Sequence, residues 1–178
     1  TVTGCLLSSA YSAAINLGYT APAIDYGWTT TLTTNYIRAA SAYYIAADGD
    51  DEGGAAIQGW VDQSIAGGLA GHGRYNVTFT NLYYEGSTIR APLFNIKNKP
   101  YPWEEEPSDA RGNIANFTFT TVEVETVPTQ RSLLIGFDAE NTPHDFTFTG
   151  VTLGGTTLTA ANWATYVQSN AHPYDIVV

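Results

Sequence analysis

A recurring strand pattern is the feature of this sequence that most constrains its fold. Stretches with β-branched and aromatic residues at alternate positions, usually with Thr second and an apolar residue sixth, recur along the chain. They read VTGCLL from Val2, LTTNYI from Leu32, FTNLYY from Phe79, FTTVEV from Phe119 and FTGVTL from Phe148. A second strand follows most of them, around Ile15, Ile45, Phe94 and Leu134. Each unit therefore predicts a strand, a turn, another strand and a variable loop.

Such a unit cannot bury its apolar face alone, and stacking copies in parallel gives each strand a hydrogen-bonding neighbour on both sides. The pattern predicts an all-β solenoid, a right-handed parallel β-helix of about five coils with a short C-terminal cap, in one domain spanning residues 1–178. An antiparallel β-sandwich is the alternative, because short Thr-rich strands with Gly-rich turns occur there too.

Two segments depart from the strand pattern. Apolar residues at helical spacing after Thr159 predict a short helix or turn within 159–170, which would form the cap. The segment 97–113 contains three prolines and an acidic run, and predicts a long exposed loop between coils.

The charge balance narrows the class of partner. Seven Lys and Arg stand against seventeen Asp and Glu, giving a net charge of −10 that repels nucleic-acid phosphates and anionic lipid. No segment approaches the roughly 18 apolar residues of a membrane span. We therefore expect no nucleic-acid and no membrane partner, and a neutral polysaccharide is favoured over an anionic one.

Several features suggest an extracellular, secreted protein. Cys5 is a single cysteine and cannot form an internal disulfide, but the Thr, Tyr, Gly and Asn richness and two glycosylation sequons, at Asn76 and Asn116, fit secretion. The chain starts at Thr1 and contains no Met, so we expect a processed, trimmed or partial chain. The first predicted strand begins at Val2, and no preceding segment would cap its edge. We therefore expect self-association through this N-terminal coil or pairing with further coils.

Longer runs of the sequence resemble a known family. They are AAIQGW, YNVTFTNLYYEGSTIRAPLFNIKN, GNIANFTFTTVEVE and LLIGFDAENTPHDFTFTGVTLGGTTLTAANWATYVQSN. These runs resemble the C-terminal coils of the β-helical glycoside hydrolases that include dextranase and isopullulanase and, more distantly, polygalacturonase. The resemblance implies an extracellular β-helix that hydrolyses glycosidic bonds with inversion, using a cluster of aspartates. The motifs are more specific for fold than for activity.

The acidic stretch YYIAADGDDEGG contains the catalytic candidates. Asp50 and Asp51, with Asp48 beside them, are the leading acid/base pair, because neighbouring like charges raise one another's pKa. The Gly-Asp-Asp triplet and the Gly-His-Gly around His72 resemble polygalacturonase motifs, but the Arg-x-Lys of that family is absent here. An inverting pair needs a separation of roughly 6.5 to 9.5 Å so that a water fits between the carboxyl groups.

The same acids leave two other interpretations open. Asp48, Asp50, Asp51 and Glu52 could supply oxygen ligands to calcium, although their spacing fits no EF-hand loop. Asp and Gly are also what solvated turns contain. Apart from this calcium hypothesis we expect no cofactor, and the three histidines lack metal-ligand spacing.

Aromatic and basic residues are the candidates for contacts with a substrate. Aromatic rings outside the core can stack on sugar rings, and they can equally seal loops against the core. The candidates are Trp28, Trp60, Tyr44, His72, Arg74 and Arg90. Two function classes thus remain: a glycoside hydrolase acting on neutral polysaccharide, and a non-catalytic subunit of an extracellular fibre or assembly.

Overall fold

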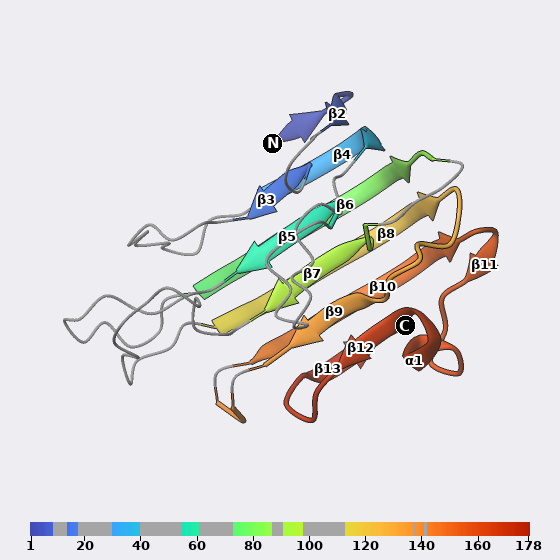
Figure 1. The fold of residues 1–178 in the computed structure, drawn as a ribbon. Coiled ribbons are helices and arrows are strands. Elements are labelled where there is room, and N and C mark those ends of the chain that lie inside the picture. Colours follow the sequence, from blue (N-terminus) through green and yellow to red (C-terminus); the bar gives the residue numbers. More distant parts are fainter. Residues whose placement is uncertain are drawn as a thin grey trace, which may run out of the picture.

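The computed structural model describes residues 1–8, 14–17, 30–39, 55–60, 73–86, 91–97, 113–136, 138–140 and 142–178. Most of these residues are in strands (Figure 1). The elements are β1 (Val2–Thr3), β2 (Leu6–Ser8), β3 (Ile15–Leu17), β4 (Thr30–Ala39), β5 (Ile57–Trp60), β6 (Gly73–Tyr84), β7 (Phe94–Lys97), β8 (Asn113–Val124), β9 (Ser132–Ile135), β10 (Pro143–Leu153), β11 (Thr156–Thr157), α1 (Trp163–Tyr166), β12 (Val167–Ser169) and β13 (Tyr174–Val177). No helix among them is both long and apolar enough to span a membrane.

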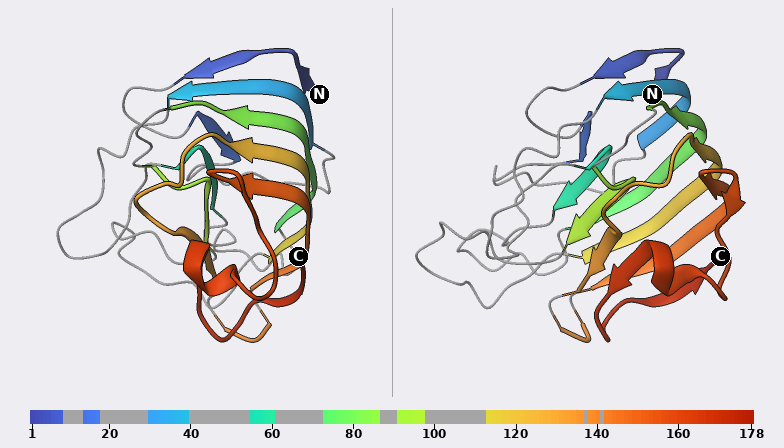
Figure 2. Two further views of the ribbon diagram at one scale, coloured as in Figure 1. Left: turned by 90° about the vertical axis from the view of Figure 1, so that its right-hand side faces the viewer. Right: turned by 45° about the vertical axis from the view of Figure 1, so that its right-hand side comes forward.

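The strands form two sheets, and the chain passes back and forth between them. The larger sheet, of eight strands, has the order β1-β4-β6-β8-β10-β11, with β2 paired to β4 and β13 paired to β10. The smaller sheet has the order β12-β9-β7-β5-β3. All pairs are parallel except β10 with β11. The strands of the two sheets run in opposite directions and form two layers (Figures 1 and 2).

The prediction of a right-handed parallel β-helix of about five coils is wrong. The described residues form open sheets, and the larger sheet mixes parallel with antiparallel pairing. The antiparallel pair arises where Gly154 and Gly155, at φ +56° and +76°, turn the chain back so that Leu153 pairs with Thr156. Two consecutive glycines with positive φ suit the tight two-residue turn of a β-hairpin. The two glycines therefore end the parallel pairing here and start an antiparallel hairpin.

The core lies between the two sheets, and stacked phenylalanine rings form its centre. Phe79, Phe119 and Phe148 are in register on β6, β8 and β10, and successive ring centroids lie 4.8 Å apart. Phe94 of the smaller sheet lies 5.7 Å from the rings of Phe119 and Phe148. All four side chains are buried. The hydrophobic effect thus holds the sheets face to face through stacked rings.

The long strands of the larger sheet bend at residues with left-handed backbone, and these residues align across strands. The first column is Asn76, Asn116, Asp145 and Asp175, with φ between +52° and +59°. The second column is Gly4, Thr34, Asn81, Thr121 and Gly150, with φ between +52° and +65°. Asn, Asp and Gly tolerate this region best. The bends curve the strands in the left view of Figure 2.

The structure describes the predicted cap at 159–170 but not most of the predicted loop at 97–113. A short helix, α1, does occur within 159–170, but it starts after Asn162 and gives way to β12 at Val167. The expected loop at 97–113 lies outside the described residues except for its ends, Lys97 in β7 and Asn113 in β8.

Candidate functional site

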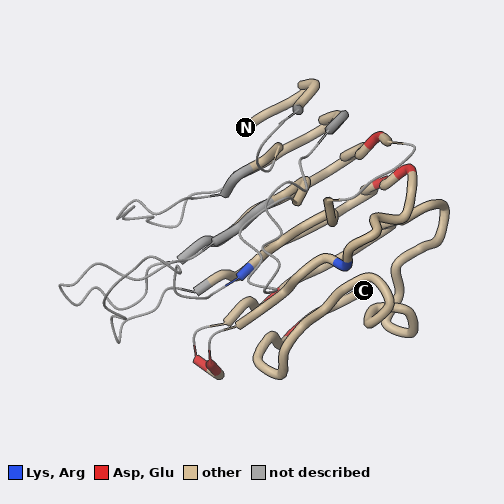
Figure 3. The backbone as a smooth tube through the Cα atoms, in the orientation of Figure 1, with Lys and Arg blue, Asp and Glu red and all other residues tan. Residues whose placement is uncertain are grey.

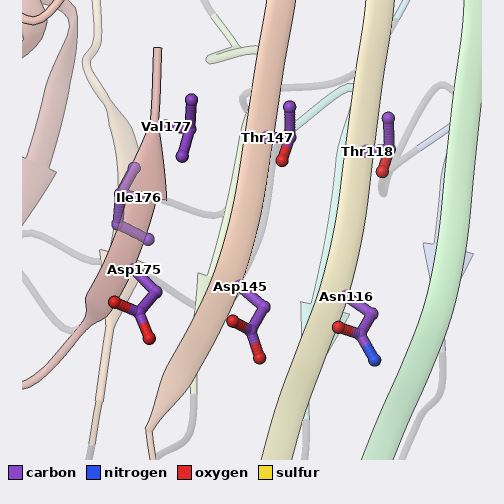
Figure 4. Close-up of a pocket in the computed structure, with 7 residues that line it drawn as sticks. All are labelled: Asn116, Thr118, Asp145, Thr147, Asp175, Ile176 and Val177. Carbon is purple, nitrogen blue, oxygen red and sulfur yellow. The ribbon is translucent and has the colours of Figure 1, made fainter.

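A hollow on the outer surface of β8, β10 and β13 is the candidate site. It has a volume of about 570 Å³ and is lined by Asn116, Thr118, Asp145, Thr147, Asp175, Ile176 and Val177. In Figure 4 the side chains of Asn116, Asp145 and Asp175 lie side by side and point the same way from three neighbouring strands. The hollow thus combines carboxylates, an amide and hydroxyl groups.

The first column of left-handed residues positions these polar side chains. Ala115, His144 and Tyr174 pair with one another across β8, β10 and β13, as do Phe117, Phe146 and Ile176. The residues between them, Asn116, Asp145 and Asp175, must therefore be neighbours. A left-handed backbone also interrupts strand alternation, so each bend residue turns its side chain outward without displacing the apolar residue that follows it.

The column continues beyond the hollow to the other predicted glycosylation residue. The side-chain amide of Asn116 donates a hydrogen bond to Oδ1 of Asn76 over 3.3 Å. Both residues are exposed, and they lie next to each other on β6 and β8. Glycosylation at Asn76 and Asn116 remains a prediction, and the two sites would compete for the same surface.

His144 holds Asp145 in place at the edge of the hollow. Its Nδ1 lies 2.8 Å from Oδ2 of Asp145, and its ring stacks on Tyr174 with centroids 4.9 Å apart and planes within 1°. The His144 side chain is 18% exposed and that of Asp145 is 48% exposed. When Nδ1 carries the proton it donates a hydrogen bond to the carboxylate, which fixes the orientation of the Asp145 side chain. Asp175 is exposed on the adjacent strand.

Between the two columns, the outward side chains of four strands are threonines. This threonine face consists of Thr31 and Thr33 of β4, Thr78 and Thr80 of β6, Thr118 and Thr120 of β8, and Thr147 and Thr149 of β10. Strand pairing places them in two rows, and Thr3 of β1 extends the second row. The side chain between each pair is Leu32, Phe79, Phe119 or Phe148, and it points into the core. The first row ends at the hollow, which it shares through Thr118 and Thr147.

Beyond the second column lies an acidic and aromatic patch. The rings of Tyr36 and Tyr83 pack against each other, tilted by 33°, with centroids 4.8 Å apart. Desolvation, followed by the negative charge of Glu125, raises the pKa of the Tyr83 phenol. Acidic residues lie at the ends of β6 and β8 in Figure 3. This patch carries charge, whereas the threonine face carries none.

Most residues that the sequence singled out cannot be placed relative to the hollow. Asp48, Asp50, Asp51, Glu52, Trp28, Tyr44, His72 and Arg90 lie outside the described residues. Trp60 ends β5 and Arg74 lies in β6, but their side chains are outside the described part of the chain as well. The catalytic, calcium-binding and substrate-binding assignments therefore remain predictions.

Asp145, Asp175 and the role of Asn116 in the hollow were not predicted from the sequence. The signal was present in the repeat itself, because Asn76, Asn116 and Asp145 each lie three residues before the phenylalanine that opens a repeat. A polar residue that recurs at one position of a stacked repeat forms a column on one face. Within the described residues, no group of three or more His, Cys, Asp or Glu could hold a metal ion.

Comparison with known proteins gives no further guide to the function. No protein-family model, no curated protein and no solved structure matches this chain. The resemblance to β-helical glycoside hydrolases therefore stays a sequence-based prediction, and the hollow is the structural feature that bears on function.

Proposed function

We propose that this chain binds a neutral extracellular polysaccharide at the hollow and hydrolyses it with Asp145 and Asp175. One observation carries the proposal: two carboxylates lie in register on adjacent strands, beside an amide and two hydroxyl groups. Hydroxyl, amide and carboxylate groups are hydrogen-bond partners for sugar hydroxyls. The net charge of −10 disfavours a polyanionic glycan.

The strand spacing favours one stereochemical course at this pair. Neighbouring strands lie about 4.8 Å apart, close to the roughly 5 to 5.5 Å between the carboxyl groups of retaining glycosidases. An inverting pair needs roughly 6.5 to 9.5 Å, which in-register neighbours do not provide without splaying. The inverting course implied by the family resemblance would instead have to use other carboxylates, such as Asp50 and Asp51.

The surroundings favour different roles for the two aspartates. Asp145, next to His144 at 2.8 Å, is the candidate nucleophile, since a hydrogen bond from the imidazole holds its carboxylate in a fixed orientation. Its oxygen attacks the anomeric carbon as the glycosidic bond breaks, while Asp175 gives a proton to the leaving oxygen. Asp175 then takes a proton from water, and this water releases the sugar from Asp145.

Reducing-sugar release from dextran, pullulan and polygalacturonate tests the proposal. We expect activity on a neutral glucan, and Asp145→Asn or Asp175→Asn should lower it on the order of 10²- to 10⁴-fold. Glu140→Gln removes an exposed carboxylate outside the hollow and is the matched control. The anomer formed first, observed by NMR, should keep the configuration of the substrate.

A parallel variant separates the two candidate sites. If Asp50→Asn/Asp51→Asn abolishes activity while Asp145→Asn/Asp175→Asn leaves it intact, catalysis belongs to the acidic stretch and the hollow assignment is wrong. Absence of both cleavage and retardation in gels containing any of the three glycans would refute glycan recognition.

Structural assembly is the second candidate function, and the edge of the larger sheet favours it. Val2 is 37% exposed and Leu6 is 59% exposed, on strands that pair with β4 and with no other strand among the described residues. An edge with exposed apolar side chains can pair with another chain. Sedimentation should then show polymers that Leu6→Lys reduces, and a monomer at high concentration would rule this function out.

A further inference from the structure

The threonine face is regular in two directions. Across the strands, the threonines repeat at the same interval as the buried rings behind them. The centroids of Phe79, Phe119 and Phe148 lie 4.8 Å apart. Along each strand, a residue and the next but one are separated by about 6.7 Å. Thr80 and Thr120, in the middle of the face, pair directly across β6 and β8. Hydroxyl and methyl groups therefore recur at two fixed intervals.

These intervals are close to those of ice. In ice each oxygen is hydrogen-bonded to four others in tetrahedral directions, and an O···O distance of about 2.75 Å gives crystal repeats of about 4.5 Å and 7.3 Å. The face differs from both repeats by about a tenth or less. Over the few strands of this face, such a mismatch accumulates to less than the diameter of a water molecule.

The chemistry of the face also suits an ordered water surface. Its outward side chains between the two bends of each strand carry no charge, so they do not impose the strongly oriented hydration of an ion. Threonine has few side-chain rotamers, because it is branched at Cβ. The phenylalanines behind it are fully or almost fully buried and packed against the smaller sheet. The hydroxyl and methyl groups are thus held in place before any ligand arrives.

We propose that the threonine face binds the surface of ice crystals. Water ordered between the threonine methyl groups and hydrogen-bonded to their hydroxyls would join the growing crystal with little rearrangement. Binding of many molecules to a crystal front would slow its growth and change its shape. This activity goes beyond the proposed glycan function and uses positions, such as Thr80 and Thr120, that do not line the hollow.

The experiment is slow growth of ice from a dilute solution of the intact chain, with the protein concentration measured in the ice and in the remaining liquid. We expect the protein to be enriched in the ice, and single crystals observed by microscopy to become faceted in its presence. Thr120→Tyr places a bulky ring in the middle of the face and should leave the protein in the liquid. Thr156→Tyr in β11, an exposed position off the face, is the matched control and should behave like the unchanged chain.

Further readouts keep the outcomes distinct. Circular dichroism establishes that each variant is folded, and Thr80→Lys serves as the test if Thr120→Tyr does not fold. Exclusion of the unchanged chain from ice, or ice enrichment that folded face variants retain, would falsify the proposal. Glycan cleavage and binding should be the same in Thr120→Tyr and the unchanged chain, so failure of either function is visible without the other.

Discussion

Loss of the Phe119 side chain should lower the free energy of unfolding more than loss of any other described side chain. It is completely buried in β8 and stacks on Phe79 with ring planes 20° apart and on Phe148 with planes 10° apart. It also lies 5.7 Å from Phe94 of the other sheet. Phe119→Ala therefore removes the ring that joins three neighbours in two sheets and leaves a cavity that rigid strands cannot close.

The expected decrease in the free energy of unfolding follows from these contacts. Burial and cavity together cost about 3 to 5 kcal/mol for a phenylalanine-to-alanine change, and each aromatic pair adds about 0.5 to 1.5 kcal/mol. With several ring pairs lost, we expect a decrease of about 5 kcal/mol in the free energy of unfolding, comparable to the whole stability of a marginal domain. Phe119→Leu keeps most of the volume but also loses the ring pairs, and it should lower the free energy of unfolding by about 2 to 4 kcal/mol.

Guanidinium unfolding followed by circular dichroism and tryptophan fluorescence measures both changes. Thr120→Ala is the control on the same strand, because its side chain faces outward and should alter stability by no more than about 0.5 kcal/mol. A decrease below about 1 kcal/mol for Phe119→Ala, or equal effects at 119 and 120, would contradict the assignment of inward and outward faces.

Three other substitutions test the backbone and the core. Thr121 is β-branched at φ +53°, so Thr121→Asn should raise stability by about 1 kcal/mol, and a lower melting temperature would be inconsistent with strain there. Gly154→Ala should lower the melting temperature by several degrees, because the left-handed residue has Val127 Cγ2 only 2.7 Å from an added Cβ; an unchanged melting temperature would contradict this hairpin geometry. Burial raises the pKa of the Tyr84 phenol above its ordinary value of about 10, so stability should be maintained below that pH and decline above it. Tyr84→Phe also loses the 3.3 Å hydrogen bond to the carbonyl of Ala91, and chemical unfolding between pH 8 and 11 should show a shallower decline than in the unchanged chain.

The sequence repeat predicted strand register better than it predicted architecture. Val2, Leu32, Phe79, Phe119 and Phe148, which open the repeats, are direct pairing partners in the larger sheet. Alternation of apolar and polar residues sufficed for this result, because a slip of one residue would expose every phenylalanine. The overall architecture depends instead on the connections between strands, and the antiparallel hairpin at Gly154 and Gly155 was not predicted.

The second strands show the limit of pattern matching. Between β3 and β7 the smaller sheet contains β5, at Ile57–Trp60, a strand that the repeat pattern did not predict. The predicted strand around Ile45 lies outside the described residues. A strand of four residues leaves little signal in the local sequence, and its position is evident only from the pairing of Ile57 with Ile15 and Phe94. The hollow was missed for a related reason. Asp145 occupies a recurring position of the repeat, but Asp175 does not precede a repeat phenylalanine. It becomes a neighbour of Asp145 only through the pairing of β10 with β13.

Because the two left-handed columns lie five residues apart in β6, β8 and β10, each of these strands presents the same width of outer surface. A copy of one such strand inserted between its neighbours would add one phenylalanine to the interior stack and two threonines to the exterior in a single step. Surface area could therefore grow by gene duplication of a strand unit without redesign of the core. The number of repeats sets how far the outer face extends across the strands. This extent can change independently of the chemistry at the hollow.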